Sequence, residues 1–172
     1  DFEGRGFANV SVKDLTTGEI SENVLERVTG DMEWANDNQT LFFVKQDPMT
    51  LRAHQVYKKN INDQLETLVF EEKDETFSVG IDKSKSKEML FIASHQTVST
   101  EYQYLDANQP DDDFKVFLER KRNIEYDLDY HNGEFFILTN ESAKNFKLMK
   151  TSRDNIQRDA WVDVIAPRQD VL

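Results

Sequence analysis

The chain has 172 residues, of which 33 are acidic and 21 basic, and its formal net charge of −12 argues against nucleic-acid binding, which needs basic clusters that displace counterions from phosphates. It has no cysteine, so it excludes disulfides and cysteine-based zinc or thiol chemistry, and no apolar run approaches the length of a membrane span. Twelve Phe, five Tyr and two Trp favour half-buried β-strands. We expect an all-β protein that binds neither nucleic acid nor membrane. A cytoplasmic location fits the lack of cysteine.

The first thirty residues resemble half of a four-stranded unit. Residues 8–15 form one expected strand and residues 24–28 another, and Thr16-Thr17-Gly18 lies between them as the expected turn. Such turn residues bond to their own backbone or tolerate left-handed conformations, which favours tight hairpins. This half unit precedes a longer repeat.

Three copies of one hairpin pattern follow, at residues 32–44, 79–92 and 126–137. Each is an apolar strand, a turn rich in Asp, Asn, Ser or Gly, and a second strand with a hydrophobic centre. Two further strands are expected after each hairpin: residues 54–58 and 67–71, then 101–105 and 114–118, then 146–150 and 161–165. Leu68, Val116 and Val164 occupy equivalent places in the last strand of each set, 48 residues apart.

A period of this length is typical of propeller blades. We therefore predict that residues 1–172 are an incomplete β-propeller of about three and a half four-stranded antiparallel blades. The half blade covers residues 1–30 and the full blades cover about 31–75, 76–122 and 123–168, with Val171 and Leu172 starting the next. An ordinary sandwich or meander is the alternative. A short helix at residues 60–65 is the one helical candidate.

An open set of blades should leave apolar faces uncovered at its ends. We expect such faces near Val10 and Val12 at one end, or near Phe136, Leu148 and Trp161 at the other. Exposed apolar faces associate, so self-association of the chain is an expected property.

No catalytic motif is present in the sequence. None of the six glycines belongs to a Gly-x-Ser-x-Gly nucleophile elbow, and His54, His95 and His131 fall in different expected blades. We therefore predict no catalytic, cofactor-binding or metal-binding residue in this chain. Aromatic residues in or near the first strands of the repeats, Trp34, Phe77 and Tyr126, are expected to pack between blades rather than bind a ligand in a central channel.

Two acidic clusters are candidates for a rim that steers substrate. One lies in the link between two blades and contains Glu71, Glu72, Asp74 and Glu75; the other is Asp111-Asp112-Asp113. The second lacks the alternating spacing and the glycine of a calcium loop. Both clusters either face a partner domain or are simply solvated.

Several strings resemble oligopeptidase B-type members of the prolyl oligopeptidase family of serine peptidases. They are residues 12–19 (VKDLTTGE), 34–38 (WANDN), 47–52 (DPMTLR), 55–57 (QVY), 69–77 (VFEEKDETF), 139–140 (TN) and 143–146 (AKNF). The resemblance implies a seven-bladed propeller that covers the active site of an α/β-hydrolase domain in the same chain. It also implies a Ser-Asp-His triad in that hydrolase domain and cleavage of short peptides after Arg or Lys. No residue here matches the triad, so none is assigned a catalytic role.

The function expected from this resemblance is a gate that filters peptidase substrates by size. Its partners would be the hydrolase domain of the same chain and short basic peptides. A propeller that binds a protein partner and has no enzymatic activity is the alternative, and a hydrolase of unknown mechanism is a third, weaker reading. A Gly-x-Ser-x-Gly motif in the downstream sequence would separate the first from the second.

Overall fold

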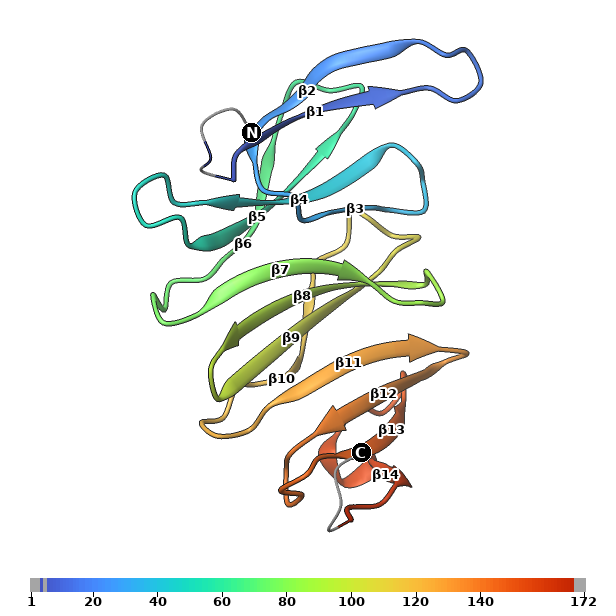
Figure 1. The fold of residues 1–172 in the computed structure, drawn as a ribbon. Coiled ribbons are helices and arrows are strands. Elements are labelled where there is room, and N and C mark those ends of the chain that lie inside the picture. The colour runs from blue at the N-terminus through green and yellow to red at the C-terminus, as the bar shows by residue number, and fades with distance from the viewer. Residues whose placement is uncertain (1–3, 5, 169–172) are drawn as a thin grey trace. The chain divides into compact units, whose positions relative to one another are not determined.

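The structure is a computed structural model that describes residue 4 and residues 6–168. The chain divides into two compact units, residues 1–82 and residues 83–172. Apart from one short 3₁₀ helix (η1, Arg158–Ala160), every regular element in the described residues is a β-strand (Figure 1). No helix in this part of the chain has the length and hydropathy needed to cross a membrane.

The first unit contains a two-stranded sheet and a four-stranded sheet. The strands are β1 (Ala8–Lys13), β2 (Ile20–Val28), β3 (Met32–Trp34), β4 (Thr40–Gln46), β5 (Ala53–Asn60) and β6 (Thr67–Glu71). Strands β1 and β2 pair antiparallel, and the second sheet has the order β3-β4-β5-β6 with antiparallel neighbours. The chain thus adds each strand beside the one before it.

The remaining strands form two more four-stranded sheets with the same order of addition. They are β7 (Ser78–Lys83), β8 (Met89–Gln96), β9 (Ser99–Asp106), β10 (Lys115–Leu118), β11 (Tyr126–His131), β12 (Glu134–Thr139), β13 (Lys147–Ser152) and β14 (Val162–Ile165). The sheet orders are β7-β8-β9-β10 and β11-β12-β13-β14, and the boundary between the two units falls within β7.

The first hairpin of each four-stranded sheet is closed by local side-chain chemistry. The Asp37 carboxylate accepts the backbone N–H groups of Gln39 and Thr40, both at 2.9 Å. The Ser84 hydroxyl oxygen accepts the N–H of Met89 at 3.0 Å in the second sheet. The third sheet uses Asn132-Gly133, with φ of 50° and 83°, which is the backbone of a two-residue primed turn.

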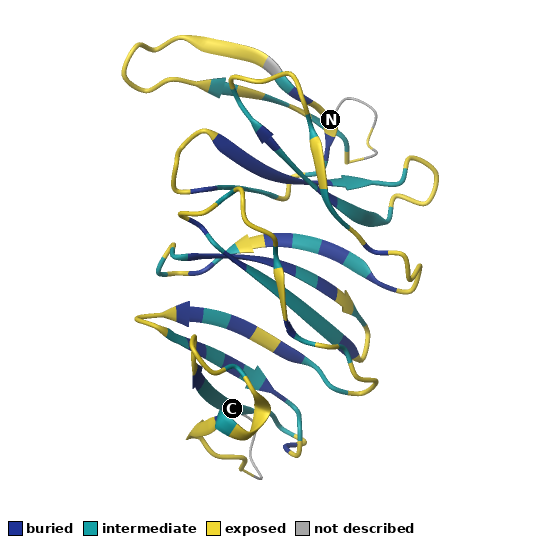
Figure 2. Cartoon of the chain, turned by 180° about the vertical axis from the view of Figure 1, so that it is seen from behind, coloured by how far each residue is buried: buried dark blue, intermediate teal, exposed yellow. Residues whose placement is uncertain are grey.

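Each unit has a hydrophobic cluster between its sheets. In the first unit the buried members are Leu25, Val28, Leu41 and Phe43, which join β2 to β4. In the second unit the buried members are mostly aromatic: Met89, Phe91, Phe117, Tyr126, Leu128, Tyr130, Phe135, Ile137 and Trp161. Strands β4 and β8 each have a run of consecutive buried residues, so both of their faces are covered, whereas the turns are mainly exposed (Figure 2).

The predicted fold class is confirmed, and the expected strands are all present with small shifts at their ends. The helix considered at residues 60–65 is wrong: β5 continues to Asn60, and a turn follows in which the Asn60 side chain accepts the N–H of Asn62 at 3.0 Å. The sequence predicts an uncovered apolar face near Trp161. Only 8% of Trp161 is exposed, so this residue itself does not belong to such a face. The exposed apolar residues nearby are Val162, Val164 and Ile165 on β14.

The blade boundaries and the total of seven blades stay predictions. Val171 and Leu172 lie outside the described residues. Phe136 and Leu148 are half-buried, as are Val10 and Val12.

Candidate functional site

The acidic link after β6 is organised by an arginine. The Arg52 guanidinium donates to the backbone carbonyl oxygens of Glu72 at 3.3 Å, Asp74 at 3.4 Å and Phe77 at 2.9 Å. Arg52 lies at the end of the β4–β5 turn. This position is beside the link because β5 and β6 are antiparallel neighbours, so β5 begins where β6 ends. Arg52 therefore fixes the path of the chain between β6 and β7.

This arrangement divides the predicted acidic residues by exposure. Glu72 is 4% exposed, and its carboxylate accepts the Asp74 N–H at 2.9 Å, so Glu72 is a structural residue of the link. Asp74 accepts the N–H and hydroxyl of Thr76 at 2.9 and 2.7 Å. Glu71 and Glu75 are exposed, and Glu71 accepts a hydrogen bond from Gln55 at 2.8 Å. Glu72 is therefore not available to an exposed rim, unlike Glu71 and Glu75.

The second acidic cluster lies in the connection between the third and fourth strands of its sheet, β9 and β10. Asp111, Asp112 and Asp113 are exposed in the connection between β9 and β10, at the end of their sheet that carries the β7–β8 turn. The link at residues 71–77 leaves its own sheet at the end that carries the β4–β5 turn instead. The two clusters thus occupy opposite ends of their respective sheets.

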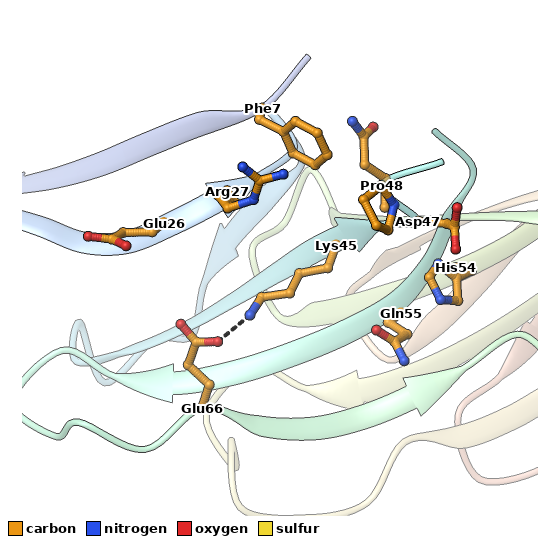
Figure 3. Close-up of a pocket in the computed structure, with 10 residues that line it drawn as sticks. Phe7, Glu26, Arg27, Lys45, Asp47, Pro48, His54, Gln55 and Glu66 are labelled. Carbon is orange, nitrogen blue, oxygen red and sulfur yellow. Dashed lines mark hydrogen bonds and ion pairs between the residues drawn. The ribbon is translucent and has the colours of Figure 1, made fainter. Parts of the chain in front are cut away.

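A cavity of about 530 Å³ lies in the first unit between the β1–β2 hairpin and the end of the second sheet (Figure 3). Strand β2 contributes Glu26 and Arg27, and Phe7 immediately precedes β1. The other lining residues come from β4, β5 and the segments that join them or lead into β6: Lys45, Gln46, Asp47, Pro48, His54, Gln55 and Glu66.

Arg27 reaches the cavity from an irregular point of β2. Its φ is 55°, and the register of β1 against β2 shifts nearby, which is the pattern of a β-bulge. The side-chain oxygen of Asn9 accepts the Arg27 N–H at 3.3 Å. The Arg27 guanidinium carbon lies 4.5 Å from the centre of the Phe7 ring, which is a cation–π distance.

Lys45 is the second cation of the cavity. Its ammonium forms an ion pair with Glu66, shown as a dashed line in Figure 3. The same ammonium lies 4.7 Å from the centre of the Tyr57 ring and 5.7 Å from that of Phe43, and these two rings stack at 5.9 Å. The charge of Lys45 is therefore matched by Glu66 and by two ring faces.

Asp47 and His54 line the far side of the cavity. Backbone N–H groups of Thr50 and then Met49, donated to the Asp47 carboxylate at 2.7 and 2.8 Å, hold its pKa below the ordinary value. The His54 Nδ1 lies 3.2 Å from the Arg52 carbonyl oxygen. Asp47 is thus an ionised carboxylate tied into its own turn.

The other residues considered for chemistry are separated or packed. His54 belongs to β5, whereas His95 and His131 are exposed on β8 and β11. In the described part of the chain no group of three or more His, Asp or Glu is placed to hold a metal ion. Tyr126 is buried, and its hydroxyl donates to the Leu118 carbonyl and accepts the Tyr102 N–H, both at 2.9 Å, which supports the packing role.

Sequence reasoning did not find Phe7, Arg27, Lys45 or Arg52 as site residues. Arg52 stood within one of the strings that carry the family resemblance, but its contacts are with residues 20 to 25 positions away. Arg27 and Phe7 are 20 positions apart and meet through a bulge, which has no signature in this sequence. These contacts depend on strand register.

Comparisons with known proteins place this architecture. The chain is 33% identical over 175 residues to dipeptidyl aminopeptidase BI of Pseudoxanthomonas mexicana, covering 100% of this chain and 24% of that protein. It is 32% identical over 152 residues to protease 2 of Moraxella lacunata, covering 86% of this chain and 22% of that protein. The chain therefore spans about a quarter of the length of these relatives.

A solved structure and a family match agree with these relatives. The structure of oligopeptidase B from Leishmania major shares the fold with a TM-score of 0.82 and 22% identity, over 95% of this chain and 24% of that chain. Residues 1–172 match the family described as the prolyl oligopeptidase N-terminal β-propeller domain. The match extends over the full sequence and confirms the resemblance found in its strings. The chain accordingly belongs to the prolyl oligopeptidase N-terminal β-propeller domain family.

Proposed function

We propose that this chain is the non-catalytic propeller part of a longer serine peptidase and that it admits short peptides to an active site located elsewhere in that protein. The single observation that carries the proposal is the family match across residues 1–172, together with relatives about four times longer than the chain. The sequence itself contains no Gly-x-Ser-x-Gly motif. A hydrolase domain of the same protein is the proposed partner, and the location is proposed to be cytoplasmic.

The size-filter role is tested with one cleavage sequence in two settings. The full-length protein should cleave an Arg-containing site in a short peptide and leave the same site uncut when it lies in a surface loop of a folded protein. A conventional protease such as trypsin serves as the control, because it should cut both. Equal cleavage of both substrates by the full-length protein would contradict the filter.

The proposed preference for Arg and Lys rests on the resemblance to oligopeptidase B-type strings. A panel of peptides that differ only in the residue before the scissile bond, with Arg, Lys, Pro and Leu, should show the highest kcat/KM for the two basic residues. A preference for Pro would overturn the assignment. If the full-length protein cleaves none of these peptides, the result would favour the alternative function, a propeller that binds a protein partner and has no enzymatic activity.

The relatives' names differ in one useful respect. One is called a dipeptidyl aminopeptidase, which implies removal of dipeptides from a free amino terminus, and the other simply a protease. Two substrates of the same sequence, one with a free and one with an acetylated amino terminus, separate these activities. We propose the less restricted activity, so both substrates should be cleaved.

Substrate steering by the acidic clusters is a further prediction for the full-length protein. The two clusters leave their own sheets at opposite ends, so each is a separate candidate for the side that faces a hydrolase domain. Glu72 and Asp74 hold the link together, so they are left unchanged. The double substitution Glu71→Gln with Glu75→Gln therefore tests the first cluster. The replacement of Asp111, Asp112 and Asp113 with Asn is the matched set for the other.

Only one of these two sets should lower kcat/KM for dibasic peptides at low salt, and the loss should shrink as salt rises, since salt screens the long-range field. Identical salt responses of both variants and wild type would show that the clusters are simply solvated. A deficit in both sets would contradict the expectation that a single cluster steers substrate.

A further inference from the structure

The cavity of the first unit contains three carboxylates, and each is accounted for. Glu66 forms an ion pair with Lys45. One oxygen of Asp47 accepts the N–H of Met49, and the N–H and hydroxyl of Thr50 at 2.7 and 3.1 Å. The Glu26 side chain points away from the other labelled groups (Figure 3). None of the three forms a hydrogen bond or ion pair with Arg27 within the described residues.

Arg27 is therefore an exposed cation that lines the cavity, and its guanidinium donors have no hydrogen-bond acceptor among the described residues. Its one described partner is the Phe7 ring at 4.5 Å, and a ring stacked on a guanidinium leaves the in-plane N–H donors exposed at the edge. Five such donors in a planar fork match the two oxygens of a carboxylate.

The backbone at Arg27 supports a specific placement of this side chain. A left-handed conformation is unfavourable for any residue with a Cβ, and it persists where the surrounding structure determines it. Here the bulge in β2 and the Asn9 side chain hold the Arg27 N–H, so the guanidinium is directed over Phe7. A regular strand would direct this side chain elsewhere.

From this geometry we propose that the cavity binds the C-terminal carboxylate of a short peptide, with the two carboxylate oxygens accepting from the Arg27 guanidinium. The volume of about 530 Å³ suits a ligand of a few residues. The paired Lys45 and Glu66, together with Gln55 and Gln46, give a polar wall that suits peptide amide groups.

This site is independent of the peptidase activity proposed above, because its test measures binding and not turnover. The full-length protein is treated with phenylglyoxal, which modifies arginine, and the modified peptides are quantified by mass spectrometry. The probes are N-acetyl-triglycine as the free acid and the same peptide as its C-terminal amide. Arg122, which is exposed in the second unit, is the internal control.

The free acid should slow modification of Arg27 several-fold and leave Arg122 unchanged, and the amide should protect neither. N-acetyl-aspartic acid α-amide, whose one carboxylate is on the side chain, should protect Arg27 less than the free-acid peptide. Equal protection by acid and amide, or no protection by either up to the solubility of the probe, would overturn the proposal. Stronger protection by the aspartyl probe would overturn the assignment to a peptide C-terminus.

Variants test the geometry by calorimetric titration of the free-acid peptide. Arg27→Gln should raise the Kd about tenfold or more, because it removes a charge-assisted pair of hydrogen bonds. Arg27→Lys keeps the charge but loses the fork, so its Kd should lie between wild type and Arg27→Gln. Arg122→Gln should bind like wild type. An unchanged Kd in both Arg27 variants would overturn the proposal, and Arg27→Lys keeps it falsifiable if Arg27→Gln fails to fold.

Discussion

The two units join their sheets in different ways. In the second unit aromatic rings fill the interface: Phe117 lies 5.0 Å from Phe135, 5.7 Å from Trp161 and 6.2 Å from Tyr126, measured between ring centres. In the first unit the buried cluster is small and mainly aliphatic, and cations complete the interface. Lys59, for example, is buried and donates to the Val24 carbonyl oxygen at 2.8 Å.

This difference shows that one strand arrangement supports two kinds of interface. Rings that touch edge to face or stack leave no room for a ligand and hold the sheets by burial. Long basic side chains instead reach across a gap with their ends on carbonyl oxygens, carboxylates or ring faces. The cavity with Arg27 and Lys45 occurs in the unit of the second kind. We therefore expect stability to depend on the aromatic interface and ligand binding on the cationic one.

The largest effect should come from a large cavity in the aromatic interface. Phe135 is fully buried and lies 4.9 to 5.0 Å from the rings of Tyr130, Tyr104 and Phe117. Phe135→Ala should lower the free energy of opening β12 by about 3–5 kcal/mol. Hydrogen exchange of the β12 amides measures this loss. Val162→Ala, at an exposed site, is the control. A loss below about 1 kcal/mol for Phe135→Ala would contradict the expectation that stability depends on the aromatic interface.

A smaller effect should follow from removal of the Arg52 guanidinium in the first unit. Arg52→Gln removes its donors to the carbonyl oxygens of Glu72, Asp74 and Phe77, and we expect a loss of about 2 kcal/mol in the local opening of residues 72–77. Hydrogen exchange of this link measures the change. Arg120→Gln is a matched control in the other unit, where Arg120 binds the Glu101 side chain at 3.1 Å. This substitution should leave hydrogen exchange of residues 72–77 unaffected.

The buried Tyr126 hydroxyl should make the aromatic interface sensitive to alkali. Burial, with a smaller contribution from the Glu101 charge, raises the pKa of Tyr126 above its ordinary value of about 10. Its stabilising effect is therefore complete below pH 10 and is lost as pH rises from there through the raised folded value. Tyr126→Phe should cost about 1–2 kcal/mol at neutral pH, because the Tyr102 N–H loses its acceptor.

Alkaline unfolding followed by near-ultraviolet circular dichroism checks this expectation, since Tyr126→Phe should show a weaker loss of stability above pH 10 than wild type. Tyr57→Phe in the first unit is the control, because Tyr57 is only half-buried. Identical alkaline profiles of wild type and Tyr126→Phe would show that another group is responsible.

The smallest effect is expected for the ion pair at the cavity. Lys45 and Glu66 keep 28% and 27% of their side chains exposed, so solvent and salt screen the pair. Lys45→Met should change the free energy of unfolding by about 0.5 kcal/mol, since methionine keeps the contacts with Tyr57 and Phe43. A urea titration at low and high salt measures this change. A loss comparable to that of Phe135→Ala would contradict the division between the two interfaces.

Local chemistry was sufficient to predict the strands and turns. The alternation of apolar and polar residues, the Asp, Ser and Asn-Gly turns and the 48-residue spacing of Leu68, Val116 and Val164 all act over short stretches or repeat regularly. The exposed acidic residues of the Asp111 cluster also followed from their surroundings in the sequence. The third-strand extension to Asn60 did not, because pairing with β4 overrides the local turn signal there.

The all-β chain of propeller blades and its family can be recognised from local patterns and from strings whose order is preserved. The burial of Glu72, the role of Arg52 in the blade link and the meeting of Arg27 with Phe7 at a cavity become apparent once the chain is folded. These features join residues about twenty positions apart. Their contacts depend on strand register and on a bulge, since a shift of one residue turns every side chain to the other face.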